Sequence, residues 1–131
     1  IAFGKNIEDT DKPHIINSAC LAQMDTVISA LPNGYKTVIG ENGISLSGGQ
    51  RQRIGIARSL FANTDVIVLD EATSALDYDT EHKVMDSISQ MDGTKTIIII
   101  AHRTETLKNC NKIISLKNGK ITKIGKYSDF F

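Results

Sequence analysis

The sequence has 131 residues, of which 40% are hydrophobic, and this is enough apolar material to form the core of one small globular domain. Its fifteen basic and fifteen acidic residues cancel. The charge balance therefore excludes the positive field of a nucleic-acid-binding protein and the charge excess of a membrane-surface protein, and we expect no nucleic-acid partner.

The start of the sequence, its apolar runs and its cysteines indicate whether it is a fragment, whether it spans a membrane and which compartment it occupies. It begins at Ile1 rather than Met and lacks the zones of a signal peptide, so we interpret this start as a fragment boundary. Its longest apolar run, residues 97–101, is far shorter than the roughly 20 residues that cross a bilayer. Cys20 and Cys110 form no CxxC pair, which favours two reduced thiols of a cytosolic domain.

Residues 1–62 are predicted to be mainly helical and to form a separate lobe. Asp11 and Pro13 suit the start of a helix, and Pro-Asn-Gly at residues 32–34 suits a turn. A further helix is expected after Leu46, with its apolar positions at Ile54, Ala57, Leu60 and Phe61.

Residues 63–131 alternate between strand and helix patterns, which predicts an α/β domain. The runs 66–69 and 95–101 are typical of strands buried on both faces. Between them, Asp77 can cap a helix that carries Val84, Ile88 and Met91. A short helical stretch at 104–108 precedes a predicted hairpin, with strands at 112–116 and 121–124 around Asn-Gly.

The stretch Leu-Ser-Gly-Gly-Gln at residues 46–50 favours an anion site at the start of a helix. Ser47 and Gln50 can form a capping box, and Gly48 and Gly49 leave the backbone N–H groups open to a phosphate. Arg51 and Arg53 oppose the helix dipole in the first turns, and a bound phosphate would remove that conflict. A capped helix with solvated arginines is the alternative.

Two adjacent carboxylates, Asp70 and Glu71, follow the strand at 66–69. The carboxyl edge of a parallel sheet is where α/β proteins bind their ligands. Asp70 can hold Mg²⁺ through water and Glu71 can polarise an attacking water, which are two tasks of phosphoryl transfer. A solvated strand end is the alternative interpretation.

His102 follows the second predicted strand. If the two strands are parallel neighbours, His102 emerges at the same sheet edge as Asp70 and Glu71. A neutral imidazole there can donate a hydrogen bond to a γ-phosphate and accept another, although a single histidine is more often structural.

Taken in order, LSGGQ at 46–50, VIVLDEATSALD at 66–77 and IIIIAHR at 97–103 resemble the nucleotide-binding domain of an ABC transporter. The resemblance implies a P-loop NTPase (RecA-like) fold, with residues 1–62 as the helical signature subdomain and 63–131 as the C-terminal part of the ATPase core. It identifies Leu46–Gln50 as the signature segment, Asp70 and Glu71 as the end of the Walker B strand, Ser74–Asp77 as the D-loop, and His102 as the switch histidine.

The resemblance also implies a second ATPase domain as partner, with ATP and Mg²⁺ bound between the two domains. In that family the signature residues Leu46, Ser47, Gly48, Gly49 and Gln50 act on ATP held by the partner, while Ser74 and Asp77 link the two sites. Glu71 would be the general base, Asp70 would position Mg²⁺, and His102 would sense the γ-phosphate.

One element of the family pattern is missing, because no G-x-x-x-x-G-K-[ST] motif occurs in the 131 residues. We expect the Walker A segment upstream, and we expect the isolated fragment to be inactive without it.

Residues 31–35 and 37–43 resemble the helical lobe and the coupling loop of exporters, which implies a transmembrane domain as partner and a location on the cytoplasmic face of the inner membrane. Residues 102–107 and 109–120 are similar to flippases of lipid-linked saccharides. Two alternatives remain at this point: a soluble ABC ATPase without a transport function, and a catalytically silent domain that dimerises on binding nucleotide.

Overall fold

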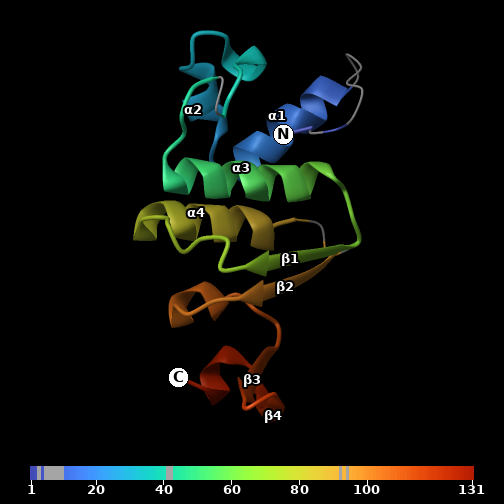
Figure 1. Cartoon of the computed structure of the whole chain (residues 1–131). Helices are drawn as coiled ribbons and strands as arrows, with labels where there is room; N and C mark the ends of the chain where they lie inside the picture. Colours follow the sequence, from blue (N-terminus) through green and yellow to red (C-terminus); the bar gives the residue numbers. More distant parts are fainter. Residues whose placement is uncertain (3, 5–10, 41–42, 92, 94) are drawn as a thin grey trace. The chain divides into compact units, whose positions relative to one another are not determined.

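A computed structural model describes residues 1–2, 4, 11–40, 43–91, 93 and 95–131, which form two compact units, Ile1–Ile100 and Ala101–Phe131. The elements, labelled in Figure 1, are α1 (Lys12–Leu21), α2 (Asp25–Ser29), η2 (Gly34–Lys36), α3 (Gly48–Phe61), β1 (Val66–Asp70), α4 (Tyr78–Ser89), β2 (Thr96–Ile100), η3 (Thr104–Leu107), β3 (Ile113–Lys117), β4 (Lys120–Gly125) and η4 (Tyr127–Asp129).

The N-terminal helices pack around α3, the longest helix of the first unit. The helix predicted from Asp11 and Pro13 is α1, which has Asp11 at its N-cap position and Pro13 in its first turn. A small core joins α1, α2 and α3, and its buried members are Ala19, Met24, Ile28, Leu46 and Ile54. This core holds the start of α3 because Leu46 lies just before the cap of that helix.

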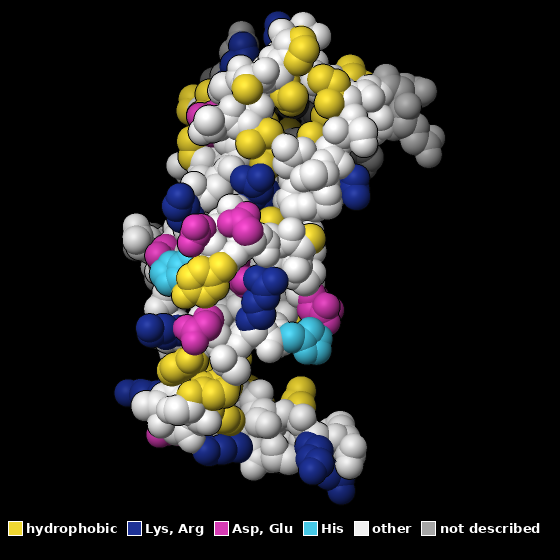
Figure 2. Space-filling view, turned by 90° about the vertical axis from the view of Figure 1, so that its left-hand side faces the viewer, with side chains coloured by type: hydrophobic (Ala, Val, Ile, Leu, Met, Phe, Trp, Pro, Cys, Tyr) yellow, Lys and Arg dark blue, Asp and Glu magenta, His cyan; other side chains and the backbone are white. Residues whose placement is uncertain are grey.

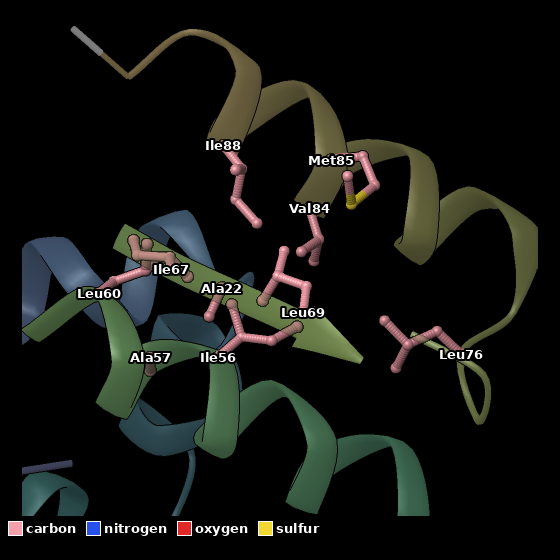
Figure 3. Packing of buried hydrophobic residues seen from close by; sticks show 10 residues of the cluster. All are labelled: Ala22, Ile56, Ala57, Leu60, Ile67, Leu69, Leu76, Val84, Met85 and Ile88. Carbon is pink, nitrogen blue, oxygen red and sulfur yellow. The ribbon is translucent and has the colours of Figure 1, made fainter. Parts of the chain in front are cut away.

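The β1–α4–β2 segment forms a parallel pair of strands with a helix in the connection. Val66 pairs with Thr96 and Asp70 with Ile100, so the two strands end side by side. Figure 3 shows side chains of α3 and α4 converging on Ile67 and Leu69 of β1. This main core contains Ala22, Ile56, Ala57, Leu60, Ile67, Leu69, Leu76, Val84, Met85 and Ile88. Its packing against α3 and α4 fixes the carboxyl end of β1.

The prediction that both strands are buried on both faces is wrong. Along β1, Ile67 and Leu69 are buried, whereas Val66 and Val68 are 52% and 55% exposed. On β2, Ile98 and Ile100 are about half exposed as well. The physical reason is that α3 and α4 cover one face of the strand pair, and no element among the described residues of this unit covers the other.

The helix predicted after Asp77 is confirmed as α4, although it is shorter than the pattern indicated. It ends at Ser89, and its last carbonyls are capped by the turn at Gln90. Met91 therefore lies beyond the helix, where it still packs against the main core.

The second unit contains the predicted hairpin. β3 and β4 pair antiparallel, and Asn118 and Gly119 both have positive φ angles, 52° and 72°, between them. Two positive φ angles are what a tight hairpin turn with right-handed strand twist requires, and Asn-Gly adopts them at little cost. β1–β2 and β3–β4 are two separate two-stranded sheets.

The described helices and strands confirm a mixed α/β chain. The expected boundary between residues 62 and 63 falls inside the first unit, where α3 and β1 share the main core, so the division into a helical subdomain and an ATPase core remains a proposal. Among the residues that the structure describes, no helix is long and apolar enough to span a membrane.

Candidate functional site

The signature segment starts α3 with the predicted capping box. The Gln50 backbone N–H donates to Ser47 Oγ over 3.2 Å, and the Ser47 N–H donates to Gln50 Oε1 over 2.9 Å. Ser47 and Gly48 are exposed, while Leu46 is anchored in the small core. The positive end of the helix dipole therefore lies at two exposed residues, an arrangement suited to an anion.

Gly48 and Gly49 differ in their surroundings. A Cβ added to Gly49 would lie 3.0 Å from the Ala75 carbonyl oxygen and 3.1 Å from Leu76 Cδ2, so this glycine permits close packing against the D-loop. A Cβ on Gly48 would come no closer than 3.8 Å to Ala75 Cβ, an ordinary contact. Packing within this chain therefore explains Gly49, and it leaves the space over Gly48 open to a ligand.

Arg51 and Arg53 have protein partners, so their positions in the first turns of α3 do not require a phosphate. The guanidinium of Arg51 donates to the Leu46 carbonyl oxygen, and that of Arg53 donates to the Gln23 carbonyl oxygen over 2.6 Å. These hydrogen bonds offset the unfavourable position of two cations near the positive end of a helix dipole. The two arginines consequently say nothing about a bound anion.

Asp70 and Glu71 lie at the carboxyl end of β1, and both are exposed. The Glu71 N–H donates to the Ile100 carbonyl oxygen over 2.9 Å, so the backbone at this carboxylate is tied to the last residue of β2. Glu71 has a φ of 47°, in the left-handed region that non-glycine residues rarely adopt. A residue keeps such a conformation only where the surrounding structure holds it, and residues of this kind are frequent at functional sites.

Residues 71–77 connect β1 to α4 and are called the 71–77 loop. The second half of this loop is the D-loop, and its last residue, Asp77, caps α4. Asp77 Oδ1 accepts the Thr80 N–H over 2.9 Å, which confirms the predicted N-cap. This hydrogen bond holds the pKa of the Asp77 carboxyl below its ordinary value. Ser74 and Asp77 are both exposed at the surface of the loop.

Side chains from two helices fix the 71–77 loop, and the sequence interpretation missed both. From α3, the Gln52 amide donates to Ser74 Oγ over 2.9 Å and accepts the Ala75 N–H over 2.8 Å. From α4, buried Glu81 accepts a hydrogen bond from buried Thr73 over 2.8 Å. The available signal for Gln52 was its place three residues after Gly49, on the same face of the helix.

His102 is the second residue of the unit Ala101–Phe131 and is exposed. It follows β2 by two residues, and β2 ends beside the end of β1. Its closeness to Asp70 and Glu71 stays a prediction, because they belong to the other unit.

Asp70 is the candidate ligand for a metal ion at this edge of the sheet. Among the described residues, no three His, Cys, Asp or Glu side chains lie together as a metal site. Mg²⁺ commonly keeps several waters and takes one or two carboxylates together with substrate phosphates, so a single exposed Asp70 fits it when phosphates are present. The exposed helix start and the exposed carboxylates together suit phosphoryl transfer.

Comparison with known families agrees with this chemistry. Residues 4–74, more than half of the chain, match the family model described as "ABC transporter".

Curated relatives match nearly the whole chain. An ATP-dependent lipid A-core flippase of Legionella pneumophila (strain Lens) is 45% identical over 129 residues, 98% of this chain and 22% of the relative. The alpha-hemolysin translocation ATP-binding protein HlyB of Escherichia coli and a toxin RTX-I translocation ATP-binding protein of Actinobacillus pleuropneumoniae are each 49% identical over 115 residues, 88% of this chain and 16% of the relative. The chain thus spans about a fifth of the length of these relatives.

A solved structure has the same fold. The structure of a bacterial Atm1-family ABC exporter with ATP bound superposes with a TM-score of 0.82 at 36% identity, covering 90% of this chain and 21% of the exporter chain.

Proposed function

Because this chain belongs to the ABC transporter family, we propose that it is the C-terminal part of the ATP-hydrolysing domain of an exporter, and that it couples ATP hydrolysis to movement of a substrate across a membrane. The observation that carries the proposal is the pair Asp70 and Glu71, exposed at the carboxyl end of β1 beside the end of β2. The exporter and translocator names of the relatives support transport over a soluble function.

Hydrolysis needs a group that takes a proton from the attacking water, and we assign this role to Glu71. Its backbone is tied to β2 by the hydrogen bond to Ile100, so the side chain starts from a defined point at the sheet edge. A fixed carboxylate within hydrogen-bond reach of water acts as a general base. His102 would donate a hydrogen bond to the γ-phosphate, which orients the phosphate for attack. Mg²⁺, held through water by Asp70, would neutralise charge on the phosphates.

The signature segment is proposed to act on ATP held by a second ATPase domain. Its support here is the exposure of Ser47 and Gly48 at the start of α3, the room that a Cβ on Gly48 would have, and the capping box of Ser47 and Gln50. These groups bind an anion but offer neither a lysine nor a platform for adenine. The partner's phosphate loop would provide the rest. Ser74 and Asp77 of the D-loop would face the same dimer interface.

We propose a transmembrane domain as the second partner, in contact with residues 37–43. Of this segment, Glu41 and Asn42 lie outside the described residues. Val38 is 66% exposed, the highest exposure among the large hydrophobic residues that the structure describes before β1. Beside it, a mainly apolar cavity of about 590 Å³ is lined by residues of α1, α2 and α3 and by Thr37 and Ile39. Figure 2 shows hydrophobic side chains around a hollow at the top of the view, with charges of both signs interspersed below. Contact with a transmembrane domain would place the segment at the cytoplasmic face of the membrane.

The test of the proposed function is the replacement Glu71→Gln in the full-length transporter. The change keeps the shape of the side chain but removes the proton acceptor, so steady-state phosphate release should fall by about 100-fold or more. ATP binding should remain near that of the wild type, because no group that contacts the nucleotide in the ground state is lost.

Glu105→Gln is the matched control, since Glu105 is an exposed residue of η3 in the second unit. It should leave phosphate release unchanged. Turnover near the wild-type rate in Glu71→Gln would remove the proposed role of Glu71.

A further inference from the structure

Gln52 connects the start of α3 to the proposed general base and to the D-loop. Its Nε2 donates to Ser74 Oγ over 2.9 Å and to the Glu71 carbonyl oxygen over 3.4 Å, and its Oε1 accepts the Ala75 N–H over 2.8 Å. A backbone N–H can only donate, so the contact with Ala75 fixes which side of the amide carries oxygen. Both ends of the amide are therefore used by a single loop.

These contacts bear on the backbone conformation of Glu71. Its N–H is held by Ile100 of β2, and its carbonyl oxygen accepts from the Ser74 N–H over 3.1 Å and from Gln52. The positive φ of Glu71 needs such surroundings, because it is unfavourable for a residue with a Cβ. Ile100 and Ser74 act here through backbone groups, whereas Gln52 acts through its side chain. Gln52 belongs to α3, the helix that starts at the signature segment.

The rest of the 71–77 loop is anchored elsewhere. Leu76 is buried in the main core, and Thr73 is held from α4 by Glu81. Gly49 packs against Ala75 and Leu76. Loss of the Gln52 amide should therefore leave the loop in place while loosening its link to Glu71 and Ser74.

We propose that Gln52 is a positioning residue for ATP hydrolysis: it fastens Glu71 and the D-loop to α3, so that a displacement of the signature segment is passed to the carboxylate that activates water. The inference rests on the proposed function, because it takes Glu71 as the general base. Gln52 itself does not contact the reacting atoms. It acts through the backbone of Glu71 and the side chain of Ser74.

The experiment uses Gln52→Leu in the full-length transporter. The leucine keeps a similar volume and removes all three hydrogen bonds. We expect kcat for ATP to fall by about 10-fold, since small misplacements of a catalytic group have effects of this size or larger, with KM changed by less than about twofold. Gln52→Glu retains the acceptor for the Ala75 N–H and can accept from Ser74 Oγ, so it should recover part of the rate.

Gln90→Leu is the matched control, because Gln90 is an exposed glutamine at the end of α4. It should leave kcat and KM unchanged. Thermal unfolding of each variant, with and without ATP, shows whether the protein is folded. If Gln52→Leu does not fold, the comparison of Gln52→Glu with the wild type carries the test, with a reduced kcat at unchanged KM expected.

A double-variant measurement separates positioning from a general structural role. If Gln52 acts through Glu71, adding Gln52→Leu to Glu71→Gln should not lower the residual single-turnover rate further. An equal further loss in that background, or an unchanged kcat in Gln52→Leu, would overturn the inference. An active Glu71→Gln variant would instead remove the proposed function, so the two failures are distinguishable.

Discussion

Gly48 and Gly49 lack side chains for different reasons, and this difference can be tested. A Cβ on Gly49 would crowd the carbonyl oxygen of Ala75, whereas a Cβ on Gly48 would make only an ordinary contact with Ala75 Cβ. We expect Gly48→Ala to leave the fold as stable as the wild type or to stabilise it by up to about 1 kcal/mol, because alanine has the higher helix propensity. In the full-length transporter its ATPase rate should fall by about 10-fold or more, because a methyl group displaces the phosphate from the N–H groups.

Gly49→Ala is the comparison, and urea unfolding together with phosphate release gives both quantities. It should destabilise the chain by about 1–3 kcal/mol through overpacking. The trans arrangement is checked by mixing Gly48→Ala subunits with subunits whose upstream phosphate-binding lysine is replaced. A heterodimer should trap ATP at one composite site. If the mixture traps no more ATP than either variant alone, the signature segment does not act on its partner.

For single residues, the sequence predicted hydrogen bonds between near neighbours in the chain and missed those between residues far apart in the chain. The capping box of Ser47 and Gln50 and the N-cap at Asp77 depend on residues within one turn, so their spacing is visible in the sequence. The partners of Arg51 and Gln52 are a backbone carbonyl and a loop that only the folded chain brings near. The sequence-based interpretation that Arg51 and Arg53 indicate a bound phosphate did not take these carbonyl partners into account.

The helix α4 provides a test at the scale of an element. Asp77 caps it, and the hydrogen bond from the Thr80 N–H lowers the pKa of this carboxyl below its ordinary value. With a folded pKa below the unfolded one, the unfolded state binds more protons, so stability rises with pH in this interval. The contribution is fully present above the unfolded pKa and is lost as the pH falls through the folded pKa.

Replacing Asp77 by Asn keeps a capping oxygen and removes the charge. Urea unfolding of the 131-residue chain between pH 7 and pH 2.5 should therefore show a wild-type advantage over Asp77→Asn that disappears in acid. Asp65→Asn, which replaces a carboxylate that caps no helix, is the control. An advantage that stays constant down to the lowest pH would contradict the assignment.

The positions of α1, α3, α4 and the strands were predictable because these elements have periodic patterns or turn residues of their own. The short helix α2 was not predicted. The burial of the strands was not predictable. Val66 and Val68 have the same β-branched character as Ile67, but only one side of β1 meets α3 and α4. Which face is covered depends on the other segments of the fold, and no pattern within the strand itself contains that information.

For the whole molecule, the uncovered face of β1 and β2 predicts self-association of the isolated chain. On this face lie four apolar side chains with exposures between 47% and 55%, those of Val66, Val68, Ile98 and Ile100. Exposed apolar faces and open strand edges promote pairing with other chains. Sedimentation of the 131-residue chain should show dimers or larger species, and Val68→Lys should raise the dissociation constant by about 10-fold or more.

Val38→Lys is the matched control, because Val38 is exposed but lies in a loop away from the strands. It should leave the association unchanged. A wild-type chain that stays monomeric at high concentration would show that the sheet face does not drive association.

The connection between β1 and β2 also determines the delay between the synthesis of the two strands. Because the strands are parallel, the ribosome must make the whole of α4 before β2 can pair with β1. At typical elongation rates this takes about 1 to 5 seconds, and during that time β2 is not available to pair with the nascent β1. Chaperones that bind short apolar segments have this interval in which to act. Synonymous codons across α4 change the elongation rate without changing an amino acid, and they therefore change the time between the synthesis of β1 and that of β2.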